Sequence, residues 1–320
     1  MYRIGIDLGG TNIAAGLVNE NRQIVDKCSV KTNAPRPVEA LVQDMVRLVR
    51  LLMARSALEK RDIAAVGVGV PCTANPTNGH MEDANNLGIA DAPFRTVLEE
   101  ALGLPVYFEN DANAAAWGEY QIGDYPEDSF AMVTIGTGIG GALILGGKLW
   151  PGINGAAAEF GHMTLKFDGV PCNCGRRGCF EAYASANALI RQAKTRMAES
   201  KGTLLWQLCG GVEERVEAKT VFAAAQSGDT DSRALLDHYT DYLSEGIANI
   251  INIFQPAIVC IGGGISQAGE LLLSPVREKT AHKIYSKNAN HNTQIVLAQL
   301  TNDAGILGAA LLGCDRRNIL

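Results

Sequence analysis

The chain has 320 residues, 47% of them hydrophobic, which is enough to bury a substantial core, most naturally in two domains. Its formal net charge of −6 at pH 7 gives no electrostatic reason to expect DNA, RNA or an anionic membrane as a partner. No apolar run reaches the length of a membrane span, and a strand-like pattern begins at Tyr2 without a signal peptide. We therefore expect a soluble, cytoplasmic protein.

The hydrophobic pattern predicts strands and helices that alternate along the chain, as in an α/β protein. The expected strands are 2–8, 13–18, 23–30, 63–70, 105–109, 130–135, 142–145, 257–261 and 294–298. The expected helices are 37–60, 112–120 and 303–312, with another between residues 264 and 294. The chain from the cysteine-rich segment to residue 254 is expected to be mainly helical.

Three glycine-rich segments follow expected strands: Gly9-Gly10-Thr11-Asn12, the run from Gly136-Thr137-Gly138 to Gly141, and Gly262-Gly263-Gly264. A dinucleotide-binding fingerprint needs a helix directly after its glycines, whereas the first two segments lead into further apolar strands. Hairpins are therefore the better interpretation, and their backbone N–H groups can face a phosphate. Each turn alone is more often an ordinary hairpin. Three of them at strand ends favour a nucleotide.

Two aspartates stand where expected strands end. Asp7 can hold hydrated Mg²⁺ near the phosphates, or it can accept an Asx-type hydrogen bond within its own turn. Asn110 and Asp111 fall where a strand meets an alanine-rich helix, the usual place for site residues in α/β folds. Asp111 is there either a base for an attacking hydroxyl or the N-cap of the helix.

Four metal-ligating side chains lie within eighteen residues: His162, Cys172, Cys174 and Cys179. Three thiolates and one imidazole match the shell of tetrahedral Zn²⁺, and four protein ligands leave no open position, so we expect a structural zinc. The alternatives are a disulfide with a spare thiol, or reduced core thiols. The other five cysteines are scattered singly, which fits a reducing compartment. Only Arg176 and Arg177 are basic nearby, which argues against a nucleic-acid zinc knuckle.

In order and spacing, these segments resemble the motif series of ROK-family sugar kinases over essentially the whole chain. The motifs are Asp7–Thr11, Glu109–Asn113, Gly136–Gly141, Glu159–His162, the Cys172/Cys174/Cys179 loop with Glu181, and Gly262–Gly264. The resemblance implies an α/β, actin-like ATPase (ribonuclease H-like) fold with two α/β domains around a central cleft. We expect a small domain of residues 1–109 plus 305–320 with the first phosphate hairpin. Residues 110–304 are then the large domain, with the catalytic aspartate, the zinc loop and the nucleotide glycines.

The resemblance also implies phosphorylation of a hexose at its 6-hydroxyl, with ATP, Mg²⁺ and structural Zn²⁺, by a homodimer that needs no nucleic acid or membrane. Asp111 is then the catalytic base, and Asn110 binds hydroxyls of the sugar ring. Glu159, His162 and Glu181 match positions that bind hydroxyls near the anomeric end, so His162 contacts metal and sugar through different ring nitrogens. The residues assigned to the nucleotide and its Mg²⁺ are Asp7, Gly9, Gly10, Thr11, Asn12, Gly136, Thr137, Gly138, Gly262, Gly263 and Gly264.

Departures from the family pattern leave the sugar open. Cys72 stands where many members have glycine, Asn12 stands where lysine is frequent, and the tryptophan common after the Asn86-Leu87 loop of glucokinases is absent. Glucose, allose, mannose, fructose and an N-acetylhexosamine all stay candidates. The family also includes sugar-responsive transcriptional regulators with an N-terminal helix-turn-helix. Only six residues precede Asp7, which leaves no place there for a recognition helix, so a regulator without its DNA-binding domain is a weaker alternative. A catalytically silent sugar sensor is also weaker, because the chain retains both Asp7 and Asp111.

Overall fold

The computed structural model describes residues 1–75, 77–123, 125 and 127–314. Its contacts divide the chain into two compact units. Unit 1 comprises Met1–Pro126, Ala142–Ala158 and Gln299–Leu320, and unit 2 comprises Glu127–Gly141 and Glu159–Ala298. The predicted domains, 1–109 plus 305–320 and 110–304, stay a prediction, and residues 315–320 of that prediction lie outside the described residues.

Unit 1 contains a five-stranded mixed sheet with the strand order β3-β2-β1-β4-β8. Its strands are β1 (Tyr2–Leu8), β2 (Asn12–Val18), β3 (Ile24–Lys31), β4 (Ile63–Val70) and β8 (Val106–Asn110). The first three strands pair antiparallel, whereas β1, β4 and β8 are parallel. A second, small sheet consists of β5 (Thr73–Ala74), β6 (Met81–Ala84) and β7 (Ile89–Ala92).

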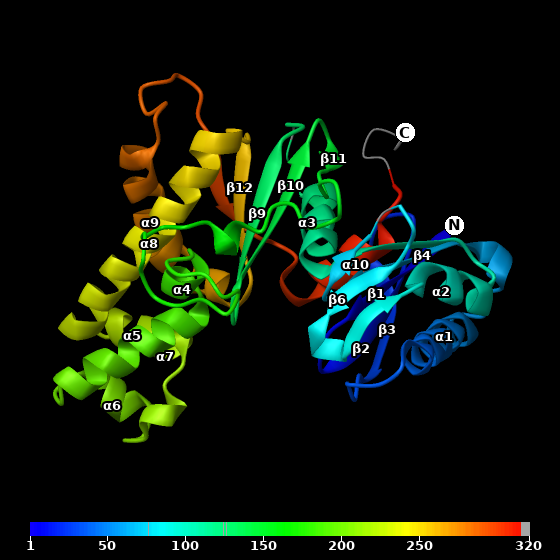
Figure 1. Cartoon of the computed structure of the whole chain (residues 1–320), viewed down its shortest axis with the longest axis horizontal. Coiled ribbons are helices and arrows are strands. Elements are labelled where there is room, and N and C mark those ends of the chain that lie inside the picture. Colours follow the sequence, from blue (N-terminus) through cyan, green and yellow to red (C-terminus); the bar gives the residue numbers. More distant parts are fainter. Residues whose placement is uncertain (76, 124, 126, 315–320) are drawn as a thin grey trace. The chain divides into compact units, whose positions relative to one another are not determined.

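The helices of unit 1 are α1 (Val38–Arg55), α2 (Phe94–Leu102), α3 (Asp111–Ile122) and α10 (Ala304–Ala310). Strand β1 shows why they cover both faces of the larger sheet (Figure 1). Every second side chain of β1 points to the same face of the sheet. On one face these are Ile4, Ile6 and Leu8, which are fully buried in a core shared with α1 and α2. Gly5 points to the other face, where a Cβ would lie 1.9 Å from the Ile306 carbonyl oxygen of α10. Asp7 shares this second face with Gly5.

The second mixed sheet has the strand order β11-β10-β9-β12-β13. Its strands are β9 (Phe130–Ile135), β10 (Ile139–Leu145), β11 (Lys148–Leu149), β12 (Ile258–Gly262) and β13 (Gln294–Leu297). Strands β9, β12 and β13 are parallel and belong to unit 2, and β10 passes from unit 2 into unit 1 after Gly141.

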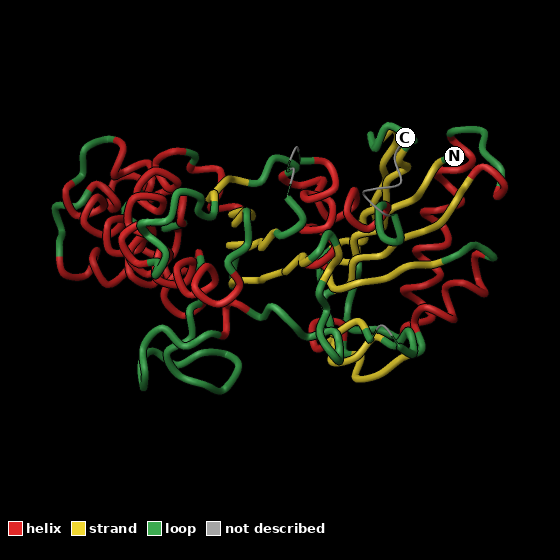
Figure 2. Tube along the Cα trace, turned by 90° about the horizontal axis from the view of Figure 1, so that it is seen from above, coloured by secondary structure: helices red, strands yellow, loops and turns green. Residues whose placement is uncertain are grey.

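Most of unit 2 is helical, as expected for the chain up to residue 254 (Figure 2). Its helices are α4 (Glu181–Ala184), α5 (Ala186–Glu199), α6 (Leu204–Leu208), α7 (Ala218–Gln226), α8 (Thr230–Phe254) and α9 (Glu270–Lys283). The 3-10 turns of the chain are η1 (Lys60–Asp62), η2 (Asn85–Leu87), η3 (Phe160–His162), η4 (Glu213–Arg215), η5 (Gly264–Ala268) and η6 (Thr301–Asp303).

The α/β pattern is confirmed, and the expected strands 2–8, 63–70 and 130–135 have the observed bounds. The glycine turn after β9 is shorter than expected, because β10 begins at Ile139 and includes Gly140 and Gly141 in extended backbone. Among the described residues, no helix combines the length and apolar character that crossing a membrane requires.

Candidate active site and metal centre

Three parallel strands of unit 1 bring several predicted site residues to one edge of the sheet. In their register Asp7 of β1 pairs with Gly69 of β4, and Val70 pairs with Asn110 of β8. Asp7, Cys72 and Asp111 therefore follow one another at the carboxyl ends of neighbouring strands. This is the edge at which open α/β sheets bind their ligands.

Asn110, and not Asp111, is the N-cap of α3. Its Oδ1 accepts hydrogen bonds from the N–H groups of Ala112 at 2.9 Å and Asn113 at 3.2 Å. Its Nδ2 donates to the carbonyl oxygen of Cys72 at 3.2 Å. The alternative that Asp111 caps the helix is therefore wrong. Asp111 is instead the first residue of α3, where the positive end of the helix dipole favours a carboxylate.

Cys72 is buried beside these residues. Burial raises the pKa of its thiol to about 12, and the negative charge of Asp111 is the second cause. The thiol is therefore protonated at neutral pH.

Asp7 is a largely buried carboxylate on the face that α10 covers, where a Cβ at Gly305 would lie 2.7 Å from its Oδ2. Burial raises the pKa of Asp7. Within the described part of the chain, the Gly9–Asn12 turn closes through the Gly9 N–H, which donates to the Asn12 carbonyl at 2.9 Å, and no turn N–H bonds the Asp7 carboxylate. The Asx-type role is therefore not observed. The carboxylate has the oxygen chemistry that hydrated Mg²⁺ requires.

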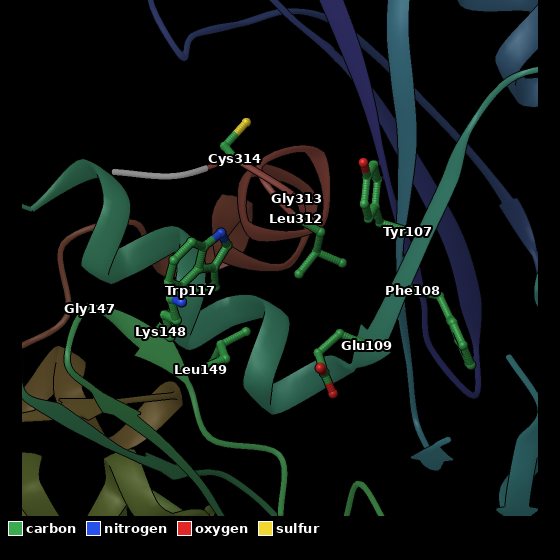
Figure 3. A pocket seen from close by; sticks show the side chains of 10 residues that line it. All are labelled: Tyr107, Phe108, Glu109, Trp117, Gly147, Lys148, Leu149, Leu312, Gly313 and Cys314. Atoms are coloured by element: carbon green, nitrogen blue, oxygen red, sulfur yellow. The ribbon is translucent and has the colours of Figure 1, made fainter. Parts of the chain in front are cut away.

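Glu109, the residue before Asn110, lies beside a pocket of about 390 Å³ in unit 1 (Figure 3). Tyr107, Phe108, Trp117, Gly147, Lys148, Leu149, Leu312, Gly313 and Cys314 also line this pocket. Glu109 Oε1 accepts hydrogen bonds from the Asn110 N–H at 2.9 Å and from Asn113 Nδ2 at 3.1 Å. Burial raises the pKa of Glu109, and these two hydrogen bonds partly offset the rise. None of the residues predicted to bind sugar or nucleotide lines this pocket.

We expect Glu109→Gln to raise the free energy of unfolding at neutral pH. A glutamine oxygen keeps both hydrogen bonds and removes a charge that burial disfavours. Because the folded-state pKa of Glu109 lies above the value of about 4.3 in an unfolded chain, both states of the wild type are protonated below that pH, and the advantage of glutamine vanishes there. The advantage grows as the pH rises through the folded-state pKa. Urea unfolding of both proteins between pH 4 and pH 8 measures it, with the exposed Glu100→Gln as a control; a difference independent of pH would contradict the burial argument.

The glycine turns of unit 2 start at one edge of its parallel strands. Strands β9 and β12 are neighbours, and Gly262 pairs with Thr134. The Gly136–Gly138 turn after β9 and the Gly262–Gly264 segment after β12 therefore leave the sheet side by side. The hairpin interpretation is confirmed for the Gly9–Asn12 turn, because β2 neighbours β1 in the sheet, and for the Gly136–Gly138 turn, because β10 neighbours β9.

The predicted metal ligands converge in unit 2. One ligand atom from each of His162, Cys172, Cys174 and Cys179 lies within 4.8 Å of the other three. Cys172 Sγ is 3.7 Å from His162 Nδ1, and Cys174 Sγ is 3.7 Å from Cys179 Sγ. A disulfide bond is about 2.05 Å long, and the three clustered cysteines form none, so the disulfide alternative is wrong. Sulfurs about 2.3 Å from a tetrahedral Zn²⁺ are about 3.8 Å apart, which fits the observed spacing.

The loop that carries the cysteines is built from its own hydrogen bonds. The Cys172 N–H donates to the Arg176 carbonyl at 2.9 Å, and the Gly175 N–H donates to the Cys172 carbonyl at 3.1 Å. The Arg176 N–H lowers the pKa of the exposed Cys174 thiol, whereas burial raises the pKa of Cys179 to about 12. A cation in this cluster therefore has to displace the proton of Cys179. His162 points Nδ1 toward the sulfurs, so its other ring nitrogen, Nε2, can bind a second partner.

Both glutamates predicted to bind sugar flank this cluster. Glu159 is exposed and precedes η3, where its carbonyl accepts the His162 N–H at 3.0 Å. Glu181 begins α4, two residues after Cys179, and its Oε2 accepts the N–H of Ile139 at 2.8 Å. That contact joins Glu181 to the glycine turn before β10. The sequence reasoning missed it, because a bond between a side chain and a backbone group 42 residues away leaves no pattern in one sequence.

Comparisons with known proteins agree with the motif series. Residues 3–316 match the model of the ROK family. A glucokinase of Streptomyces coelicolor is 37% identical over 313 residues, which is 96% of each chain. The crystal structure of a ROK family glucokinase from Streptomyces griseus, in complex with glucose and AMPPNP, superposes with a TM-score of 0.82 at 36% identity and covers 98% of this chain and 99% of that one. A putative xylose repressor of Caldicellulosiruptor is 31% identical over 97% of this chain and 77% of its own length. The expected actin-like ATPase fold is confirmed by the Streptomyces griseus structure.

Proposed function

Since this chain belongs to the ROK family, we propose that it is an ATP-dependent sugar kinase that transfers the γ-phosphoryl group to the 6-hydroxyl of a hexose. The observation that carries the proposal is the set of acidic residues at the carboxyl edge of the unit 1 sheet. There Asn110 caps α3 and Asp111 begins it, one strand away from the end of β4 and two from Asp7. A base and a metal-holding carboxylate are the two acidic groups that phosphoryl transfer to an alcohol requires.

In this proposal Asp111 takes the proton of the 6-hydroxyl as the hydroxyl oxygen attacks phosphorus. Asn110, whose Oδ1 is engaged by two backbone N–H groups, has one N–H left on Nδ2 for a sugar hydroxyl. Asp7 would hold a hydrated Mg²⁺, and this ion would supply positive charge to the β- and γ-phosphates. The turns Gly9–Asn12, Gly136–Gly138 and Gly262–Gly264 offer backbone N–H groups to the nucleotide.

The metal cluster supports the sugar-binding half of the proposal. We assign it a structural Zn²⁺ held by His162 Nδ1, Cys172, Cys174 and Cys179. Bound there, the ion would fix the ring of His162, whose Nε2 would then bind a sugar hydroxyl, while Glu159 and Glu181 bind hydroxyls near the anomeric end. Four ligands complete the shell, so the ion has no role as a Lewis acid.

Glucose is the first candidate sugar, because the glucokinase relatives match this chain over nearly its full length and one of them binds glucose with AMPPNP. Cys72 departs from the glycine that the family pattern leads us to expect, and its carbonyl bonds Asn110 Nδ2, so mannose, allose, fructose and N-acetylhexosamines belong in the same test.

A coupled assay of ADP release with ATP, Mg²⁺ and each of these sugars tests the proposal. We expect turnover with at least one hexose, highest with glucose, and a 6-phosphate product by NMR. Sugar binding without turnover of ATP would instead favour a sugar-responsive sensor, as the repressor relative suggests. Neither binding nor turnover with any sugar would contradict the proposal.

A further inference from the structure

The backbone of Ile139, which follows the Gly136–Gly138 turn, is contacted at its N–H and at its carbonyl by the segments that carry the metal ligands. On its N–H side, Glu181 Oε2 accepts the hydrogen bond at 2.8 Å. On its carbonyl side, Gly161 packs so closely that a Cβ there would lie 2.2 Å from the Ile139 oxygen. Gly161 is next to His162, and Glu181 is two residues after Cys179. All of these residues belong to unit 2.

The turn itself leaves room for the Glu181 carboxylate. A Cβ at Gly138 would lie 2.2 Å from Glu181 Oε2, so a side chain at this position and the carboxylate exclude each other. The other end of the turn is held by the same segment, because the Ala186 N–H donates to the Gly136 carbonyl at 2.9 Å. Residues 181–186 thus fasten the turn at both of its ends.

The fastening segment is in turn tied to the metal cluster. The Phe180 N–H donates to the Met163 carbonyl at 2.7 Å, and Thr164 forms a β-bridge with Cys179. A metal that joins His162 to Cys179 therefore holds the two segments on either side of Ile139 together.

We propose that Glu181 is a positioning residue for the nucleotide: its carboxylate holds the Gly136–Gly138 turn in the shape that receives the phosphates of ATP. The proposal rests on the proposed function of that turn as a phosphate site. It gives Glu181 a second task besides sugar binding, and it links the metal centre to nucleotide affinity through Cys179, Glu181 and Ile139.

The sign of the effect separates this role from simple proximity. A carboxylate that merely lies near the triphosphate repels it, so removing the charge would strengthen nucleotide binding. If the carboxylate instead orders the turn, removing it weakens nucleotide binding. The nucleotide must then order the turn itself, and this cost reduces the free energy of binding.

The test measures the Kd of Mg²⁺–AMPPNP by calorimetry, without sugar, on the full chain. We expect Glu181→Ala to weaken binding about tenfold, since it removes a hydrogen bond to a charged group. Glu181→Gln, whose amide oxygen can still accept the Ile139 N–H, should stay within about twofold of the wild type. Gly138→Ala keeps the charge of Glu181 but displaces its carboxylate, and should weaken binding like Glu181→Ala.

Glu159→Gln is the matched control, because it alters the other sugar-binding carboxylate without touching the turn. It should change sugar affinity and leave AMPPNP affinity as it is. Amide hydrogen exchange gives a readout that needs no ligand: the Ile139 amide should exchange faster in Glu181→Ala and at the wild-type rate in Glu159→Gln. Metal content is measured for every variant, so that loss of the ion is not mistaken for loss of the bond.

Unchanged or tighter AMPPNP binding in Glu181→Ala, with active wild type, overturns the inference and leaves the kinase assignment intact. Wild type that binds no AMPPNP and phosphorylates no sugar overturns the proposed function itself. In that case accelerated Ile139 exchange would still attest the contact, and the nucleotide role would fall with the function.

Discussion

Asp111→Asn is expected to lower kcat by about 10²- to 10⁴-fold, the usual contribution of a positioned base. Asparagine has the same shape but cannot take the proton of the attacking hydroxyl. The cap of α3 is supplied by Asn110 through two backbone N–H groups, and asparagine at position 111 keeps an oxygen that can accept the Ala112 N–H, as Asp111 Oδ1 does at 2.8 Å. We therefore expect the sugar Kd and the midpoint of thermal unfolding to change little.

Steady-state kinetics with the best sugar of the screen, together with calorimetric sugar binding, measures both parts of this prediction. The control is Asp237→Asn on α8, the same chemical change at an exposed carboxylate that pairs with Lys279 of α9. It should leave kcat unaltered. Near-normal turnover in Asp111→Asn would remove Asp111 from the role of base, whereas loss of folding would mean that its part is structural.

The capping of α3 also marks a limit of prediction from sequence. Asparagine and aspartate are about equally good N-caps, and they stand next to each other at the start of α3. Sequence alone therefore left Asp111 as either base or cap. The structure decides it, because Asn110 stands at the N-cap position and its Oδ1 accepts the N–H groups of both Ala112 and Asn113, whereas Asp111 lies inside the helix and its Oδ1 accepts the Ala112 N–H at 2.8 Å.

The central strands were predictable because each is an apolar run that ends at glycines, proline or polar residues, as in 63–70 and 130–135. The small sheet of β5, β6 and β7 was not predicted, since strands of two to four residues are too short to show a period. The metal ligands were predictable from spacing, because His162 and three cysteines within one loop leave few other arrangements. The bond from Glu181 to Ile139 was not, since it depends on how a distant turn packs against α4.

Cys172→Ser is expected to abolish metal binding and to weaken sugar binding by about 10- to 100-fold, the usual effect of disturbing the shell around a metal site. Cys172 is the cysteine whose sulfur faces His162 Nδ1, so its loss opens the shell next to the side chain that we assign to the sugar. Elemental analysis measures the zinc, with one ion per chain expected in the wild type. Calorimetry measures the sugar Kd.

The physical reason is that little else orients His162. The loop between Met163 and Gly178 is mostly exposed, and from it Arg176 donates hydrogen bonds to the His162 carbonyl at 3.1 Å and to Thr164 Oγ1 at 2.8 Å. Neither of these bonds is made by the imidazole ring. Without an ion, the buried Cys179 thiol keeps its proton, and no metal bond joins the three remaining ligands.

Cys28→Ser is the matched control, because Cys28 lies on β3 in unit 1 and is not among the clustered ligands. It should keep one zinc per chain and wild-type sugar affinity. Wild type purified without zinc, or a zinc-free Cys172→Ser that binds sugar as tightly as the wild type, would contradict the role assigned to the cluster. Cys172→Ser also tests the link between the metal and the nucleotide through Glu181. If the link exists, this variant should weaken AMPPNP binding, as Glu181→Ala does. If the ion serves the sugar alone, AMPPNP affinity should stay unchanged.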